Sequence, residues 1–146
     1  MKAELDRPSA RSLTIVAPWG LALGLAVASE FAGLIHLAHA REHLHEYVPF
    51  GLFFLASGFF QIVWAVMVFW PRSRAFFVVG LLANGATVAL WALTRTVGLP
   101  IGPEHWTAES VGVADVVASV LELLIVAGCA WILASSGAPE VAAHPT

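Results

Sequence analysis

Residues 48–70 read VPFGLFFLASGFFQIVWAVMVFW, and this stretch contains no charged residue. A helix needs roughly 20 mostly apolar residues to cross the hydrocarbon core of a bilayer, so the stretch is long enough to span a membrane. Pro49 suits the first turn of such a helix, and Pro71 cannot continue it. The sequence therefore predicts a transmembrane helix over residues 48–70.

Three further stretches have the same character. Residues 13–40 are interrupted by one charge, Glu30, residues 75–94 by none, and residues 111–136 by two acidic residues. Backbone exposed to lipid must form its hydrogen bonds in a helix or a closed barrel, and these stretches are too long and too continuously apolar for barrel strands. The predicted fold is all-α, a four-helix transmembrane bundle over residues 13–136, with helices at about 13–44, 48–70, 74–96 and 109–136.

The composition excludes several classes of protein. Of the 146 residues, 59% are hydrophobic and 12% are charged, and this charged share is about half that of an ordinary soluble domain. The net charge of -3 offers no basic surface for nucleic acid, and a single cysteine, Cys129, excludes an internal disulfide or a multi-cysteine metal site. The lipid bilayer is therefore the predicted environment.

Basic residues predict the orientation. Five of them lie before the first stretch or between the second and the third: Lys2, Arg7, Arg11, Arg72 and Arg74. Because basic segments stay on the cytoplasmic side, we expect an up-down bundle in the plasma membrane, with cytoplasmic tails at 1–12 and 137–146. A signal peptide cleaved after Ala28 is the alternative, but the apolar run continues to residue 40, beyond a normal signal core.

Histidines gather at the end of the first predicted helix. His36, His39 and His43 fall within an arc of about 60° on one helix face. Asp115 enters the fourth helix at a comparable depth, in the outer part of the bundle. Imidazole and carboxylate are common ligands of Cu(II), Zn and Fe. We therefore predict a transition-metal site formed by these four residues. The alternatives are that the histidines only border the membrane surface, or that they sense pH.

Other polar residues predict supporting groups. At a rise of about 1.5 Å per residue, four fall near the middle of the membrane: Glu30, Gln61, Asn84 and Glu122. Four more fall near the outer surface: Glu46, Arg95, His105 and Glu109. A charge at the bilayer centre costs at least about 2.5–3.5 kcal/mol. We therefore expect Glu122 to act as a metal ligand or proton relay and Glu30 as a proton carrier, or else both to be bonded inside the bundle.

The remaining members of this set have simpler expected roles. Gln61 and Asn84 are typical of side chains that hold membrane helices together. Arg95 is expected to pair with Asp115 or Glu109.

Small residues at four-residue spacing on the first helix predict close packing within the bundle: Gly20, Gly24, Ala28 and Ala32. The proline-containing loop before the fourth helix is expected to cap the outer end with Glu104, His105 and Trp106.

Two segments of the sequence are similar to a known group of proteins. HLHEYVPFG (residues 43–51) and GLPIGPEHW (residues 98–106) resemble uncharacterised small four-pass membrane proteins of high-GC bacteria. The resemblance covers most of the chain and implies no activity.

Three functions fit these observations. The first is metal handling, or a small redox-metal centre, with Cu, Zn or Fe as the bound ion. The second is a small proton-coupled transporter that uses Glu122 and Glu30. The third is an accessory or structural subunit of a homo- or hetero-oligomer in the membrane. The sequence lacks phosphate-binding, hydrolase and metalloprotease motifs, so catalysis is expected only through the metal.

Overall fold

The computed structural model describes residues 14–136. It is all-helical apart from one short pair of strands, and its elements are β1 (Thr14–Ile15), α1 (Trp19–Glu46), α2 (Val48–Met67), β2 (Arg72–Ser73), α3 (Arg74–Thr96) and α4 (Val113–Ser135). The predicted tails at 1–12 and 137–146, and the predicted cytoplasmic Lys2, Arg7 and Arg11, lie outside the described residues.

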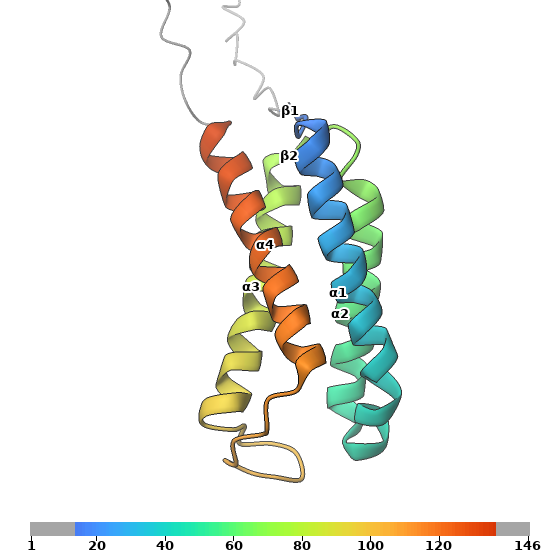
Figure 1. Ribbon diagram of the computed structural model, residues 1–146, viewed down its shortest axis with the longest axis vertical. Coiled ribbons are helices and arrows are strands. Elements are labelled where there is room, and N and C mark those ends of the chain that lie inside the picture. Colours follow the sequence, from blue (N-terminus) through green and yellow to red (C-terminus); the bar gives the residue numbers. More distant parts are fainter. Residues whose placement is uncertain (1–13, 137–146) are drawn as a thin grey trace, which may run out of the picture.

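The four helices lie side by side and make two distinct ends (Figure 1). We call the end that carries β1 and β2 the strand end, and the end that carries the α1–α2 turn and the long α3–α4 loop the loop end. α1 packs closely on α2 and also on α4, and α3 packs on α4. α2 and α3 make few backbone contacts, and near the strand end the Trp64 side chain of α2 lies between them against Phe76 and Gly80 of α3.

The helix boundaries differ from the predicted ones in three places. α1 begins at Trp19 rather than near residue 13, because Pro18 takes an extended conformation at its N-cap and a proline disfavours helix in the residue before it. Upstream, Thr14 and Ile15 pair antiparallel with Ser73 and Arg72.

The other two differences lie at the end of α2 and the start of α4. α2 ends at Met67, before the predicted residue 70. α4 begins at Val113 rather than near residue 109. There the Asp115 carboxylate accepts a hydrogen bond from the Gly112 N–H at 3.2 Å, which satisfies one of the free N–H groups of the first turn.

Glycines bring α1 and α2 together. A Cβ on Gly33 would lie 2.9 Å from the backbone oxygen of Gly58, so only glycine permits this approach. The predicted close packing of small residues on α1 holds for Ala28 and Ala32, which are buried. It does not hold for Gly20 and Gly24, because a Cβ on either would meet nothing within 4 Å.

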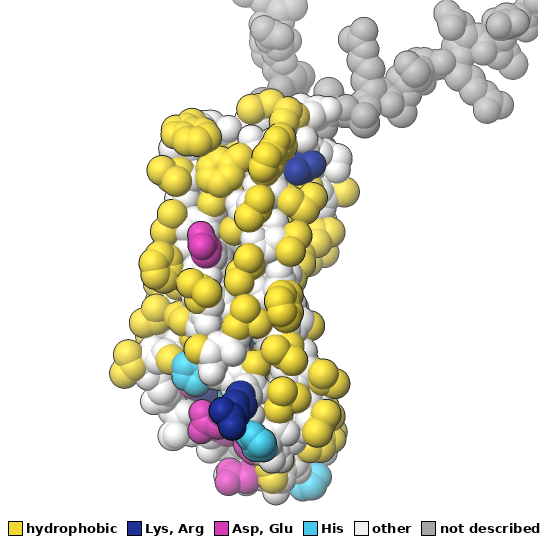
Figure 2. Space-filling model, turned by 90° about the vertical axis from the view of Figure 1, so that its right-hand side faces the viewer, with side chains coloured by type: hydrophobic (Ala, Val, Ile, Leu, Met, Phe, Trp, Pro, Cys, Tyr) yellow, Lys and Arg dark blue, Asp and Glu magenta, His cyan; other side chains and the backbone are white. Residues whose placement is uncertain are grey.

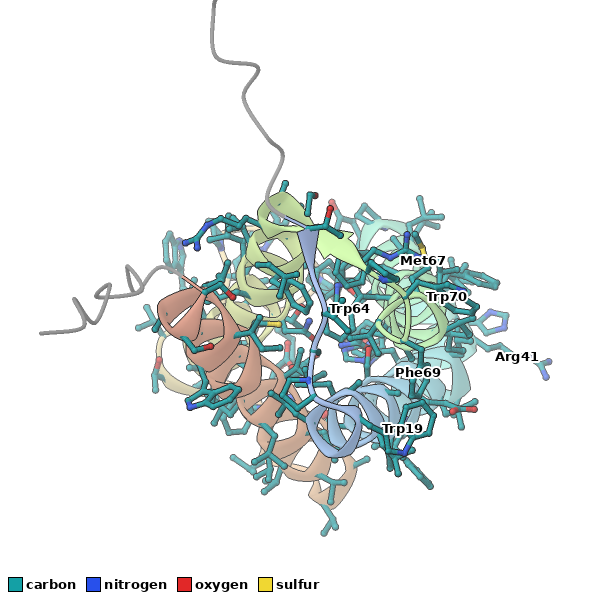
Figure 3. The ribbon with its side chains drawn as sticks, turned by 90° about the horizontal axis from the view of Figure 1, so that it is seen from above. Trp19, Arg41, Trp64, Met67, Phe69 and Trp70 are labelled. Carbon is teal, nitrogen blue, oxygen red and sulfur yellow. The ribbon has the colours of Figure 1, made fainter. Side chains whose placement is uncertain are left out.

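The apolar core lies toward the strand end. Figure 3 looks onto this end and shows Trp64 inside the bundle, whereas Trp19, Phe69 and Trp70 lie on its outside. The Trp64 ring is stacked on Phe76, with ring centroids 5.1 Å apart, and is 3% exposed. Ile125, Cys129 and Ile132 of α4 belong to the same buried cluster.

Each of the four helices is long and apolar enough to cross a membrane. Their outer faces carry exposed Leu, Val and Phe side chains along most of their length. Figure 2 shows hydrophobic side chains over most of one face. The histidine and most of the charged side chains on this face gather at the loop end, with one acidic side chain at mid-height and one basic side chain near the strand end. This distribution is that of a multi-pass membrane protein, whose surplus of apolar surface faces lipid.

Candidate functional site

A cavity of about 330 Å³ lies between the helices in the half of the bundle that ends at the loop end. All four helices and the α3–α4 loop contribute to its walls. Most of the wall is aromatic or aliphatic, and the residues that supply this apolar surface include Ile35, Phe50, Phe53, Phe54, Leu90, Trp91, Leu99 and Ile101. The polar residues fall in two groups, one deep in the bundle and one near the loop.

The deep group, which we call the floor, connects all four helices. Gln61 Nε2 donates to Glu122 Oε1 at 2.8 Å and to Asn84 Oδ1 at 3.0 Å. The Gln61 backbone oxygen accepts from the Ser29 hydroxyl at 2.8 Å. His36 Nε2 lies 3.7 Å from Glu122 Oε1. Gln61 and Glu122 are each 1% exposed, so the bundle buries these polar groups together.

The order of donors and acceptors in the floor is fixed by the backbone. Asn84 Nδ2 donates to the Gly80 carbonyl at 2.8 Å, which leaves Asn84 Oδ1 to accept from Gln61. His36 Nδ1 lies 2.9 Å from the Ala32 carbonyl. Because a carbonyl oxygen only accepts, Nδ1 carries the hydrogen and Nε2 faces Glu122. His36 and Glu122 both line the cavity.

His36, His39 and His43, which we call the histidine ladder, line the cavity without forming one ligand set. The Phe54 ring of α2 lies against both ends of it, with ring centroids 5.3 Å from His36 and 4.1 Å from His43. His39 Nδ1 is 2.9 Å from the Ile35 carbonyl, and His43 Nδ1 is 3.1 Å from Glu46 Oε2.

The predicted metal ligands are accordingly not assembled. Within residues 14–136 no three or more His, Cys, Asp or Glu side chains come together in a group that could hold a metal ion. Asp115, the predicted carboxylate ligand, is instead paired with Arg95, whose Nη2 donates to Asp115 Oδ2 at 2.8 Å.

The second polar group forms the rim of the cavity. Arg95 also donates to Glu109, so one guanidinium joins α3, the α3–α4 loop and the first turn of α4. The Arg95 side chain is 13% exposed, and such a shielded, two-partner pair is stronger than an isolated surface ion pair. Gly102 of the loop sits against the Phe50 ring, since a Cβ there would lie 2.8 Å from Phe50 Cζ.

The loop covers the cavity with a different segment from the predicted one. Leu99, Pro100 and Ile101 line the cavity. The predicted capping residues Glu104, His105 and Trp106 are exposed, so His105 contributes nothing to the walls.

Glu30 is a predicted site residue that lies outside this arrangement. Its side chain is on the exposed face of α1 and does not line the cavity, whereas Ser29 beside it points inward to Gln61. Because successive residues of an α-helix are turned by about 100° around its axis, Ser29 faces the bundle while its neighbour Glu30 faces outward. Glu30 cannot join Glu122 in a relay within one copy of the bundle.

Three buried side-chain atoms in the described part of the chain have no hydrogen-bond partner: Gln61 Oε1, Trp91 Nε1 and Arg95 Nε. Buried polar atoms are normally paired, so each marks a place where a ligand or ion could complete the bonding. Two of the three belong to residues that line the cavity, and the third belongs to its floor.

Sequence reasoning missed the aromatic wall. Phe50, Phe53 and Phe54 lie in an all-apolar stretch, and nothing in its pattern distinguishes a cavity wall from a lipid-facing side. A clue in the sequence is Gly58. Its lack of a side chain allows α2 to approach α1 closely there, which determines the face of α2 that turns toward the bundle. Comparisons with protein-family models, with curated proteins and with solved structures found no match to this chain.

Proposed function

We propose that the protein binds a small, largely apolar molecule in the loop-end cavity. The cavity itself carries this proposal, because about 330 Å³ lined by four helices and a loop is within the usual range of ligand pockets. A bundle whose polar residues only held helices together would have no need of such a space, since protein interiors are normally close-packed.

The walls indicate the chemistry of the ligand. Phe50, Phe53 and Phe54 offer flat apolar surface to a hydrocarbon or aromatic body. His36 and Glu122 at the floor offer polar contacts to one head group at its deep end. A molecule with an apolar body and a single polar head fits this division.

The proposal includes an orientation in the membrane. Arg72 and Arg74 lie at the strand end, and basic residues favour the cytoplasmic side. We therefore place the strand end and both termini in the cytoplasm, consecutive helices running up and down, and the loop end outside the plasma membrane. The ligand then enters from the outer side.

Binding is better supported than passage through the bundle. A proton-coupled carrier needs polar groups from Glu122 toward the strand end. The buried side chains of α4 on that side are Ile125, Cys129 and Ile132, and they pack in an apolar cluster. Glu30, the other predicted carrier, is on the outer face of α1.

The test is to fill the cavity and ask which small molecules are lost. Ala118 lines the cavity and is 6% exposed, whereas Val120 on the same helix is 52% exposed. Protein is purified from native membranes into lipid nanodiscs, and bound molecules are identified by liquid chromatography and mass spectrometry. We expect a molecule enriched on the wild type to fall at least about tenfold in Ala118→Phe and to persist in Val120→Phe.

A second cavity-filling variant and a measurement of helicity show whether a loss of binding comes from misfolding. Thr87→Phe fills the cavity from α3, and helicity by circular dichroism must match the wild type in all variants. Equal recovery of the same molecules from all four proteins, or no enrichment over empty nanodiscs, would overturn the proposal.

A further inference from the structure

We propose that the floor of the cavity is a metal-ion site formed by His36 Nε2, Glu122 Oε1 and Gln61 Oε1, and that it takes a divalent transition-metal ion. Of the four predicted ligands this set keeps only His36; it adds Glu122, which was expected from the sequence as a further ligand or proton relay, and Gln61, which was not expected to bind the ion. It does not depend on the proposed organic ligand, because protein atoms alone supply it.

His36 is held in the form that binds metals. Its Nδ1–H donates to the Ala32 carbonyl at 2.9 Å, which leaves the lone pair of Nε2 free and fixes the plane of the ring. Metal-binding histidines are commonly held in this way, with the second ring nitrogen bonded to a carbonyl or carboxylate. The Phe54 ring, 5.3 Å away between centroids, packs against the imidazole and limits its rotation.

The distance between His36 and Glu122 fits a shared ion better than a shared proton. Nε2 and Oε1 are 3.7 Å apart, whereas a charged N–H···O hydrogen bond would bring them to about 2.7–2.9 Å. Nitrogen and oxygen ligands lie about 2.0–2.2 Å from zinc. At the tetrahedral angle two such ligands lie about 3.3–3.6 Å apart, close to the 3.7 Å between these two atoms.

Gln61 supplies the third atom. Both hydrogens of its amide nitrogen are used, one by Asn84 and one by Glu122, so its orientation is fixed and Oε1 is left as an acceptor. This oxygen is buried and receives no hydrogen bond, and the Gln61 side chain interacts with the His36 ring. Glu122 Oε1 accepts one hydrogen bond, from Gln61 Nε2, whereas His36 Nε2 and Gln61 Oε1 accept none, and a cation would bind the free lone pairs of all three atoms.

The cavity leaves the ion accessible. His36 and Glu122 both border it, so the ion keeps open coordination positions toward water or a ligand, as in metal sites that exchange their fourth ligand. One imidazole with oxygen donors suits Zn²⁺, Co²⁺ or Cu²⁺ rather than Ca²⁺.

The experiment titrates the purified protein, carrying no polyhistidine tag and stripped by a chelator, with Co²⁺ alone in detergent. Binding is followed by the visible absorption bands of the bound ion, and Zn²⁺ is then added to displace it. We expect about one Co²⁺ per chain for the wild type. His36→Ala and Glu122→Gln should each weaken binding by at least about tenfold.

Matched controls use histidines of the same helix. His45 is exposed and outside the cavity, so His45→Ala should bind like the wild type. His43→Ala should do so as well, since its ring is bonded to Glu46. Loss in His43→Ala but not in His36→Ala would overturn the assignment, as would wild-type binding no tighter than that of Glu122→Gln. Because metal alone is the probe, neither result bears on the organic ligand.

Discussion

Gly80 of α3 sits under the indole of Trp64, and a Cβ there would lie 2.7 Å from Trp64 Cζ2. The indole cannot retreat, because it is stacked on Phe76 and its N–H donates to the Phe76 carbonyl at 3.4 Å. Gly85 lies on the same helix, yet a Cβ there meets only Val126, at 3.9 Å. The two glycines therefore differ in what an added methyl group costs.

We predict that Gly80→Ala lowers the free energy of unfolding by about 1–3 kcal/mol, the usual cost of overpacking a filled core. Gly85→Ala should leave it unchanged or raise it by up to about 1 kcal/mol, since alanine favours helix. Unfolding by SDS in mixed micelles, followed by circular dichroism, measures both. Equal effects of the two substitutions would contradict the packing seen around Trp64.

Several residues of the site follow from the sequence and several do not. Gln61, Asn84 and Glu122 occur singly in apolar helices at similar depth, and polar groups in lipid seek partners, so their meeting is expected. Glu30 shares that depth, but whether it faces the bundle depends on how α1 is rotated against α2, which no spacing records. The Phe54 contact with His36 and His43 depends on the same rotation.

At the scale of elements, the α3–α4 loop is fastened to the bundle by Arg95. The guanidinium bonds to Glu109 in the loop and to Asp115 in α4, and the Glu109 N–H donates to the Thr94 carbonyl at 3.0 Å. These bonds hold Leu99, Pro100 and Ile101 against the cavity. The same loop would close the site over a ligand.

We predict that Arg95→Gln loosens the loop and leaves the helices intact. Amide hydrogen exchange of residues 98–111 should quicken by about tenfold, the equivalent of roughly 1.4 kcal/mol of local stability. Arg41→Gln, an exposed arginine that points away from the bundle in Figure 3, is the control and should not alter exchange there. Faster exchange throughout α3 and α4 would show instead that Arg95 stabilises the bundle as a whole.

Helix boundaries were predictable where charge marks them. α3 runs from Arg74 to Thr96, over the predicted 74–96, because basic residues flank its apolar stretch. The start of α1 was misplaced because Thr14–Ile15 is apolar enough to continue a helix by composition. Its strand conformation comes from pairing with β2, a contact distant in sequence.

For the whole molecule, the proposed orientation can be measured on intact cells. Ser73 at the strand end and Thr107 in the loop are both exposed, whereas the native Cys129 is 0% exposed. In a Cys129→Ala background, Thr107→Cys should react with a membrane-impermeant maleimide. Ser73→Cys should react only after the cells are permeabilised. The reverse pattern would place the loop end, and with it the cavity, on the cytoplasmic side.

The β1–β2 pair has a consequence for biosynthesis. β1 precedes α1, and its partner β2 follows α2, so the pair cannot form until the ribosome has delivered both helices. Once formed, it fastens the α1–α2 hairpin at the end opposite its own turn. The first half of the chain is thus fastened at both ends, by the turn between α1 and α2 and by the strand pair.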